Sequence, residues 1–551
     1  MLFPYFIHHL VLLQRALTFS VTTMRRDNSP SQLPRSGVTP IICLLSATRK
    51  SNTISRHFST SSATMPHMST QAERPKSART RRQPLGFTND IVRPGKLWPV
   101  SVHGFPLLPD EQPVGTVRDS LYDLIPFGPR EEKLIGTSPF LRLQKVKQLG
   151  FVFRVWPGAT NTRYEHSLGC YHLAVKALRA LLQRGEDGGL AGISISSVQT
   201  LVVAALLHDI GHYPFSHTIE ELGYPIVHHE KVGRSIIENG EIATILEQDY
   251  HLSPGRVADF IDPPKTKALP PDDELLSHLL SGALDVDKLD YLPRDARACN
   301  VPYGGVDVER LLGSLRIHPN VNGLRRIVVT HKGISPLHSL LHARQEMFDN
   351  IYWHHTSRAF QVMLMRAVHE ALLSGALQTS QLVGLDDASL LLLLAEERMP
   401  ASSRVLVADL EMRRPYKGVV EISRMAGRLF SRLDALFWNA NRRRHVEQLL
   451  AAELARVLEM EIADHEVLFD IPRPEKWEMD VWVTFGAHPP VGMAELVTWV
   501  QATGLQPDDL ARYEQHQRRI RVVVPERLRA PLQARVDDLL LPMLETLVEM
   551  E

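Results

Sequence analysis

A run of apolar residues that ends abruptly in a histidine and an aspartate constrains the fold of this chain more than any other sequence feature. Residues 201–207 are all apolar, and Ser196 or Ser197 can cap the helix that they predict. His208 and Asp209 follow directly, and Gly211 then lets the chain turn. Adjacent residues on a helix diverge by about 100°, but where the backbone turns at a helix end they can face one ion. A capping aspartate beside a core histidine is the simpler alternative.

Helical periodicity dominates the chain from about residue 117. It predicts helices over 162–183, 275–297 and 335–377, and prolines predict a loop over 263–271. Segments with the composition of strands are few, namely 324–330, 482–485 and 520–524. The predicted fold class is therefore mainly α, with a helical core and a small α+β C-terminal region.

The overall composition excludes several classes of protein. Lys+Arg and Asp+Glu are both 62, so no global basic excess is present to hold nucleic-acid phosphates, although a local patch is not excluded. Hydrophobic residues make up 44% and charged residues 23%, which is typical of globular domains and excludes a membrane-embedded chain. Three cysteines cannot form a disulfide framework and fit a reducing compartment.

The first 85 residues differ in composition from the rest of the chain. Among the first eighty, Asp27 and Glu73 are the only acidic residues, whereas arginine, serine and threonine are frequent. This composition is typical of an organellar transit peptide and predicts mitochondrial import. The alternatives are an unstructured tail, or a start at Met65 or Met68 with a nuclear or cytoplasmic location.

Two further blocks place charged residues beside predicted helices. Arg163 lies three residues before His166, on the same side of the helix predicted over 162–183. A neutral imidazole can ligate a metal, and an arginine beside it suits a phosphate oxygen. In the second block, five residues occupy about a third of the helix circumference: Asp287, Lys288, Tyr291, Arg294 and Asp295. Such runs are usually solvated faces, but the tyrosine and the apolar flanks favour a pocket face.

These blocks resemble the HD-domain metal-dependent phosphohydrolases. Within that family they are most similar to the deoxynucleoside triphosphate triphosphohydrolases, the branch of bacterial dGTPases and vertebrate sterile-alpha-motif HD proteins. The resemblance covers residues 117–373 and weakens toward residue 485. It rests on motifs that recur in the family's order: Gln148-Leu149-Gly150, Trp156-Pro157-Gly158-Ala159, Arg163-x-Glu165-His166-Ser167-Leu168-Gly169, His208-Asp209-x-Gly211-His212-x-Pro214-Phe215-Ser216-His217 and Asp285-x-Asp287-Lys288-x-Asp290-Tyr291.

The resemblance implies a divalent metal held by four side chains of this chain: His166, His208, Asp209 and Asp287. Two neutral imidazoles and two carboxylates suit Fe, Mn, Zn or Mg, with open positions for water and a phosphate oxygen. The resemblance further implies that the catalytic group consists of His212, His217, Glu220 and His229.

The resemblance also implies the substrate contacts. Phosphate-binding cations are Arg163, Lys288 and Arg344, and the sugar-contacting pair is Tyr291 and Asp295. Gln148 and Leu149 match positions near the sugar and base, and Tyr352 and His354 match two later positions in the pocket. One departure concerns regulation: Gly136 stands where the vertebrate relative has a carboxylate that reads an activating guanine. Activation by GTP of the vertebrate kind is therefore not expected, whereas another nucleotide activator is left open.

The expected organisation is a leader over 1–85, an HD phosphohydrolase core over 117–375, a helical extension over 376–464 and a small α+β region over 465–551. The expected function is hydrolysis of deoxynucleoside triphosphates to deoxynucleoside and inorganic triphosphate by a homo-oligomer with no membrane association. Two alternatives stay open. One is another HD phosphohydrolase, acting on nucleoside monophosphates or cyclic nucleotides. The other is a non-catalytic protein that binds nucleotides or single-stranded nucleic acid.

Overall fold

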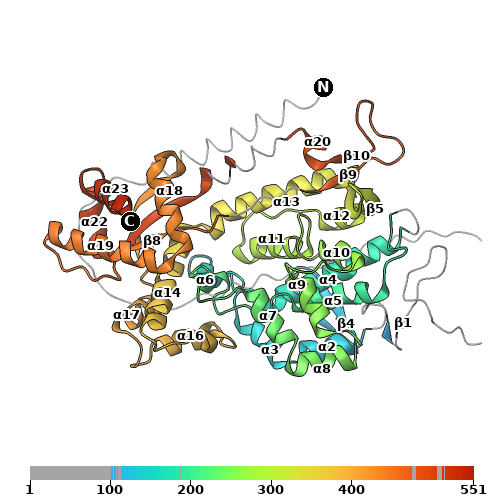
Figure 1. Ribbon diagram of the computed structural model, residues 1–551, viewed down its shortest axis with the longest axis horizontal. Helices are drawn as coiled ribbons and strands as arrows, with labels where there is room; N and C mark the ends of the chain where they lie inside the picture. The colour runs from blue at the N-terminus through green and yellow to red at the C-terminus, as the bar shows by residue number, and fades with distance from the viewer. Residues whose placement is uncertain are drawn as a thin grey trace, which may run out of the picture. The chain divides into compact units, whose positions relative to one another are not determined.

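The computed structural model describes residues 101–102, 105–106, 108, 113–184, 188–474, 480–505, 512–513 and 516–550. The predicted leader over 1–85 lies outside the described residues. The described chain is mainly helical, with a helical core, a small α+β C-terminal region and small sheets, as the periodicity and composition predict (Figure 1). Among the described residues, no helix combines the length and apolar character needed to cross a membrane.

Three helices far apart in sequence form the part of the core that positions the site. Helix α4 (Arg163–Leu182) packs on α5 (Ile195–Leu207), and α11 (Val286–Cys299) packs on α4 (Figure 1). The helix predicted over 162–183 is confirmed. It begins where Thr162 and Glu165 cap each other's backbone amides, because these groups lack partners in the first turn. The apolar run of α5 is buried throughout from Ser197 to Leu207.

The N-terminal cap predicted for α5, Ser196 or Ser197, is wrong. Ser194 precedes α5, and the hydroxyl groups of Ser196 and Ser197 instead accept hydrogen bonds of 2.8 and 2.9 Å from Arg256. Arg256 belongs to α9 (Pro254–Ile261), which packs against α5. A side-chain partner from another helix therefore occupies the oxygens that a local cap would use.

Two long predicted helices are interrupted. The segment 275–297 forms the end of α10 (Pro271–Ser277) and then α11, because Asp285 caps a new helix by accepting a hydrogen bond of 2.8 Å from the backbone N–H of Lys288. The segment 335–377 forms α13 (Ile334–Met347), a π-helical turn (Phe348–Tyr352) and α14 (His355–Leu373). Both interruptions bear on the site, because Asp285 and Tyr352 lie at them.

Further α-helices precede, connect and follow these core helices along the described chain. They are α2 (Pro129–Ile135), α3 (Ser138–Arg142), α6 (His217–Glu220), α7 (His229–Ile237), α8 (Gly240–Gln248), α12 (Val308–Ser314), α15 (Thr379–Leu382), α16 (Asp387–Leu394), α17 (Ala401–Glu411), α18 (Arg428–Ala435), α19 (Ala440–Leu458), α20 (Trp499–Thr503), α22 (Glu526–Gln533) and α23 (Leu541–Met550). In Figure 1, α18, α19, α22 and α23 gather around β8 (Leu468–Asp470).

All three predicted strands are confirmed, but they belong to two sheets. One sheet has the order β10 (Leu496–Thr498), β9 (Trp482–Thr484), β6 (Leu324–Thr330), β5 (Leu315–Val321), with β9 parallel to β6 and the other pairs antiparallel. The other places β11 (Arg519–Val524) between β7 (Lys417–Ser423) and β8, antiparallel to both. Residues after 465 thus contribute to both sheets. Two-stranded ribbons are formed by β1 (Ser101–Val102) with β2 (Phe105–Pro106), and by β3 (Gly115–Asp119) with β4 (Asp123–Phe127).

Candidate active site

The ends of the three core helices bring two histidines and an aspartate together. The Nε2 atoms of His166 from α4 and His208 from the end of α5 are 3.3 Å apart. The Asp287 carboxylate of α11 is 3.0 Å from Nε2 of His166 and 3.9 Å from Nε2 of His208. Metal–ligand bonds of about 2.0–2.2 Å place neighbouring ligand atoms roughly 3 Å apart, so the spacing fits one ion.

Both imidazoles are oriented by a hydrogen bond on the opposite ring nitrogen. Nδ1 of His166 lies 2.8 Å from the fully buried carboxylate of Asp290, and Nδ1 of His208 lies 2.9 Å from the backbone carbonyl of Ala205. With these acceptors, Nδ1 carries the proton and Nε2 is left as the donor for a metal. Asp290 is a functional residue that the sequence analysis missed, although its position three residues after Asp287 in a helix was a usable signal.

The fourth predicted ligand, Asp209, lies at the edge of this cluster. Its oxygens are 3.6 Å from Nε2 of His166 and 3.4 Å from Nε2 of His208. The same carboxylate accepts a hydrogen bond of 2.6 Å from Arg163. Cys170 also lies within reach of the cluster, and burial raises the pKa of its thiol, which disfavours the thiolate that a metal would need. The donor set of two imidazoles and two carboxylates thus fits a divalent transition metal or Mg²⁺.

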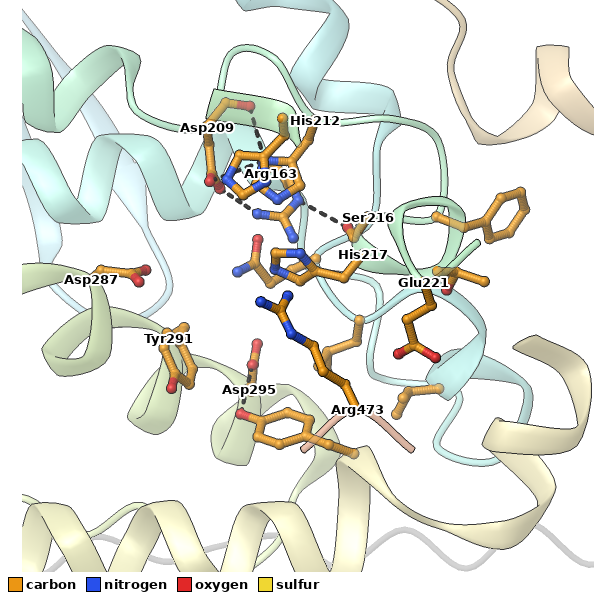
Figure 2. A pocket seen from close by; sticks show the side chains of 18 of the residues that line it. Arg163, Asp209, His212, Ser216, His217, Glu221, Asp287, Tyr291, Asp295 and Arg473 are labelled. Carbon is orange, nitrogen blue, oxygen red and sulfur yellow. Dashed lines mark hydrogen bonds and ion pairs between the residues drawn. The ribbon is translucent and has the colours of Figure 1, made fainter. Parts of the chain in front are cut away.

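A strained turn after the His-Asp pair carries the next histidine. Phe215 and Ser216 have φ values of +57° and +58°, which non-glycine residues rarely adopt. The backbone N–H of Phe215 donates to Asp387 at 2.7 Å, and the Ser216 hydroxyl donates to the carbonyl of Lys147 at 2.8 Å. These bonds hold a conformation that costs on the order of 1–3 kcal/mol per residue. They direct His217, the first residue of α6, toward the cavity (Figure 2).

Glu220 joins two of the predicted catalytic histidines. Its carboxylate oxygens are 2.9 Å from Nδ1 of His217 and 2.8 Å from Nδ1 of His229. Burial alone raises the pKa of Glu220, but hydrogen bonds from the two imidazoles outweigh it and hold that pKa well below its ordinary value. Burial lowers the pKa of His229, but the hydrogen bond to Glu220 and the charge of that carboxylate outweigh this effect, so the pKa of His229 is raised. The ionised carboxylate therefore favours the protonated form of His229 beside the cavity.

His212 lies in a different electrostatic environment from its neighbours. Its ring lies against that of His229 with centroids 3.6 Å apart, and its Nδ1 is 3.1 Å from the Asp209 carboxylate. Burial lowers the pKa of His212 well below its usual value, and the positive charge of Arg163 adds to this effect. His212 is therefore neutral near pH 7, with the buried Nε2 atom lacking a hydrogen-bond partner in the described chain.

The site opens into a cavity of about 480 Å³ whose walls carry most of the predicted residues (Figure 2). Four guanidinium or ammonium groups come from the HD core and α14: Arg163, Lys288, Arg344 and Arg358. Predicted residues on the walls also include Gln148, Leu149, His208, Asp209, His212, His217, His229, Asp287, Tyr291, Asp295 and Tyr352. A cavity of this size holds a nucleotide-sized ligand.

One wall is shaped by a buried carboxylate and two tyrosines. Asp295 accepts hydrogen bonds of 2.8 Å from Asn161 and 3.0 Å from Tyr352, and Tyr291 lies one turn before it on α11. Burial raises the pKa of Asp295 to about 6, against the opposing hydrogen bonds from Asn161 and Tyr352. Tyr352 becomes part of this wall because the π-helical turn separates α13 from α14.

Two predictions about the pocket do not agree with the structure. His354 is absent from the described lining of the cavity and instead packs edge-on against Trp156, with ring centroids 4.9 Å apart. Arg294 was placed on the pocket face of α11, but it is fully buried and pairs with Asp290 and with Asp119 of β3, each at 2.8 Å. The two carboxylates compensate the guanidinium charge inside the core, where an unpaired charge would be strongly destabilising.

Glu221, Arg358 and Arg473 are among the lining residues that the sequence analysis missed, and each comes from a segment without a motif. Glu221 follows α6, Arg358 lies in α14, and Arg473 follows β8. Arg358 donates to both carboxylate oxygens of Glu221 at 3.0 Å. Nothing in the linear sequence links these positions, since they are joined only by tertiary packing.

Comparison with protein families identifies two regions of the chain. Residues 163–293 match the model described as HD domain, and residues 306–541 match the model described as HD associated region. The first region contains the metal-ligand cluster, and the second contains Arg344, Tyr352, Arg358 and Arg473. Residues of both matched regions therefore line one cavity.

Several curated proteins and a solved structure are similar to this chain. An uncharacterized protein of Methanocaldococcus jannaschii is 31% identical over 307 residues, covering 56% of this chain and 60% of that protein. The human deoxynucleoside triphosphate triphosphohydrolase SAMHD1 is 29% identical over 282 residues, covering 46% of this chain and 44% of SAMHD1. A hypothetical protein of Aquifex aeolicus with a crystal structure has a TM-score of 0.58 at 27% identity, covering 77% of this chain and all of that one. The chain spans about half the length of the curated relatives that it matches.

Proposed function

Because the chain belongs to the HD-domain phosphohydrolase family, we propose that it hydrolyses deoxynucleoside triphosphates to deoxynucleosides and inorganic triphosphate. One observation carries the proposal. A single cavity joins a metal-ligand cluster, a carboxylate-linked histidine group, several cations and a wall of two tyrosines and an aspartate. The similarity to SAMHD1, whose name states this activity, supports the same substrate class.

The metal would be held by His166, His208, Asp209 and Asp287. When bound, such an ion lowers the pKa of a coordinated water and polarises a phosphoryl oxygen. Asp290 orients the His166 ring through Nδ1, the nitrogen that faces away from the metal position, as residues outside the ligand sphere commonly do in metal sites. The side chains offered here suit Fe, Mn, Zn or Mg.

The residues around Glu220 supply a proton close to the metal cluster. The His217 side chain is 54% exposed, and its Nδ1 bonds to Glu220, so Nε2 faces the cavity. A histidine held by an ionised carboxylate can donate a proton to a leaving oxygen near pH 7. His229 shares the same carboxylate and raises the local positive charge, while neutral His212 can accept or donate one hydrogen bond.

The cations and the tyrosine wall match the two halves of a nucleotide. A triphosphate carries about four negative charges near neutral pH, and Arg163, Lys288 and Arg344 line the cavity to meet them. Tyr291 and Asp295 lie successive helical turns beyond Asp287 and thus beside the metal cluster. A deoxyribose fits this wall, since Asp295 can bond to the 3′-hydroxyl and Tyr291 crowds the 2′ position.

The test is turnover of the four dNTPs by the purified chain loaded with Fe, Mn, Zn or Mg, with the phosphorus product identified by ion chromatography. Inorganic triphosphate is the expected product. Deoxynucleoside monophosphates and cyclic nucleotides are assayed in parallel, because turnover of those alone would favour the alternative HD activities. Binding of dNTP without any turnover would favour the non-catalytic alternative.

The matched control is the double variant His208→Ala with Asp209→Ala. It should lose both bound metal and turnover while its helical circular dichroism stays near that of the unmodified chain, because both residues lie at the end of α5 rather than within it. Full stoichiometric metal in the double variant would contradict the ligand assignment.

A further inference from the structure

The HD-associated region contributes an arginine to the cavity that no motif assigns. Arg473 lies three residues after β8, far in sequence from the HD motifs, yet it lines the same cavity as Arg163 and His217. In Figure 2 its side chain runs from the C-terminal segment into the cavity and ends between His217 and Asp295. The C-terminal region thus places a guanidinium group beside the proposed reaction site.

The backbone that carries Arg473 is held in place by buried bonds. The fully buried Asp470 carboxylate accepts hydrogen bonds of 2.8 Å from Arg358 and 3.1 Å from Arg521. The carbonyl of Pro472 accepts a hydrogen bond of 2.8 Å from Arg518. Prolines flank Arg473 on both sides and restrict the backbone to extended conformations. The direction in which Arg473 leaves the backbone is therefore set by the fold.

Within the described part of the chain, no carboxylate balances the charge of Arg473. Other cations at the cavity have carboxylate partners: Arg163 with Asp209 at 2.6 Å, Lys288 with Asp285 at 2.5 Å, and Arg358 with Glu221 at 3.0 Å. None of the described residues forms an ion pair with Arg473. Because a guanidinium without a carboxylate partner can bond to two oxygens of a phosphate at once, it is suited to an anionic ligand.

We propose that Arg473 binds the phosphate tail of the substrate, so that the HD-associated region completes the phosphate site of the HD domain. This inference rests on the proposed function, because it takes a nucleoside polyphosphate as the ligand. It has a consequence for specificity: the contribution of Arg473 grows with the number of phosphates. It is small for a deoxynucleoside monophosphate and largest for a triphosphate or free inorganic tripolyphosphate.

The test compares Arg473→Gln with Arg473→Lys and with the control Arg404→Gln, which changes an exposed arginine of α17 that does not line the cavity. Two readouts are measured on the metal-loaded protein: the calorimetric Kd for inorganic tripolyphosphate, and KM and kcat for a dNTP. Arg473→Gln should raise both Kd and KM by about tenfold to a hundredfold, the effect of losing hydrogen bonds to a charged group. Arg473→Lys should recover part of the lost affinity, because lysine keeps the positive charge but cannot form the bidentate hydrogen bonds of a guanidinium.

The outcomes separate this inference from the proposed function. If dNTPs are hydrolysed and Arg473→Gln matches Arg404→Gln in both Kd and KM, the inference is overturned while the function stands. If no dNTP is hydrolysed but Arg473→Gln still weakens tripolyphosphate binding, Arg473 is a polyphosphate-binding residue and the function is overturned. If the unmodified protein neither hydrolyses dNTP nor binds tripolyphosphate, both are overturned.

Discussion

At the scale of single residues, Asp295 makes a pH-dependent contribution to stability. Burial raises the pKa of this carboxyl to about 6 from the ordinary 3.8. Between these values the folded chain keeps the proton that the unfolded chain has lost, so stability falls as the pH rises from about 4 to 6. Above pH 6 the cost of the buried charge reaches about 3 kcal/mol.

Asp295→Asn should remove this cost. In urea denaturation the variant should gain up to about 3 kcal/mol over the unmodified protein at pH 7.5, and the difference should close below about pH 4. Asp537→Asn, which makes the same change at an exposed position, is the control and should leave the free energy of unfolding nearly unchanged. A constant difference between pH 4 and pH 7.5 for Asp295→Asn would contradict the raised pKa.

Tyr291 and Asp295 together predict the choice of sugar. Removing a buried hydrogen bond costs about 1–3 kcal/mol, so Asp295→Ala should lower kcat/KM for a dNTP about fivefold to a hundredfold. Tyr291→Ala should instead narrow the preference for dNTP over NTP, because a smaller side chain no longer crowds the 2′ position. Steady-state kinetics with dGTP and GTP measure both effects. Equal turnover of dGTP and GTP by the unmodified protein would refute the argument about the sugar.

At the scale of elements, the close approach of α4 and α11 sets the metal-ligand spacing. A Cβ atom at Gly169 would overlap the Asp290 carboxylate and lie 2.6 Å from a nitrogen of Arg294. Gly169→Ala should therefore displace the buried Asp290–Arg294 pair, lower the free energy of unfolding by about 1–3 kcal/mol and reduce bound metal, because Asp290 orients His166. Denaturation and metal analysis of the purified variant measure these changes.

Gly313→Ala is the matched control for this helix contact. Gly313 lies in α12, and a Cβ atom there would meet no atom within 4 Å. The substitution should stabilise the protein by up to about 1 kcal/mol, as alanine does in a helix interior, and leave bound metal unchanged. Full metal occupancy and unchanged stability in Gly169→Ala would show that the Asp290–Arg294 pair can move without cost.

At the scale of the whole molecule, the resemblance at Gly136 predicts that turnover of the proposed substrates does not require GTP. Gly136 follows α2 as its C-terminal cap and has no side chain to bond to a guanine edge. Leu141 nearby is a 40% exposed apolar residue, which cannot pair with a nucleotide phosphate. The rate of dCTP hydrolysis should therefore be the same with and without GTP. A strict and saturable GTP requirement would show that other residues have taken over guanine recognition.

The sequence by itself determined the elements and much of the candidate site. Hydrophobic period predicted α4, and composition predicted the strands β6, β9 and β11, because these signals arise from residues within about a turn or a strand of one another. His166, His208 and Asp287 stand in motifs that could be located without a structure. Short-range physical constraints leave such traces in a linear pattern.

Only the tertiary structure decided what surrounds those residues. His166 bonds to Asp290, 124 positions away, and Arg358 to Asp470, 112 positions away. Arg294 pairs with Asp119 in the core instead of lying on the pocket face, and Arg473 lines the cavity although it belongs to the HD-associated region. Each of these contacts depends on how helices and strands pack, and long-range packing imposes no period or spacing on the sequence. The electrostatics of the site therefore had to be found in the folded molecule.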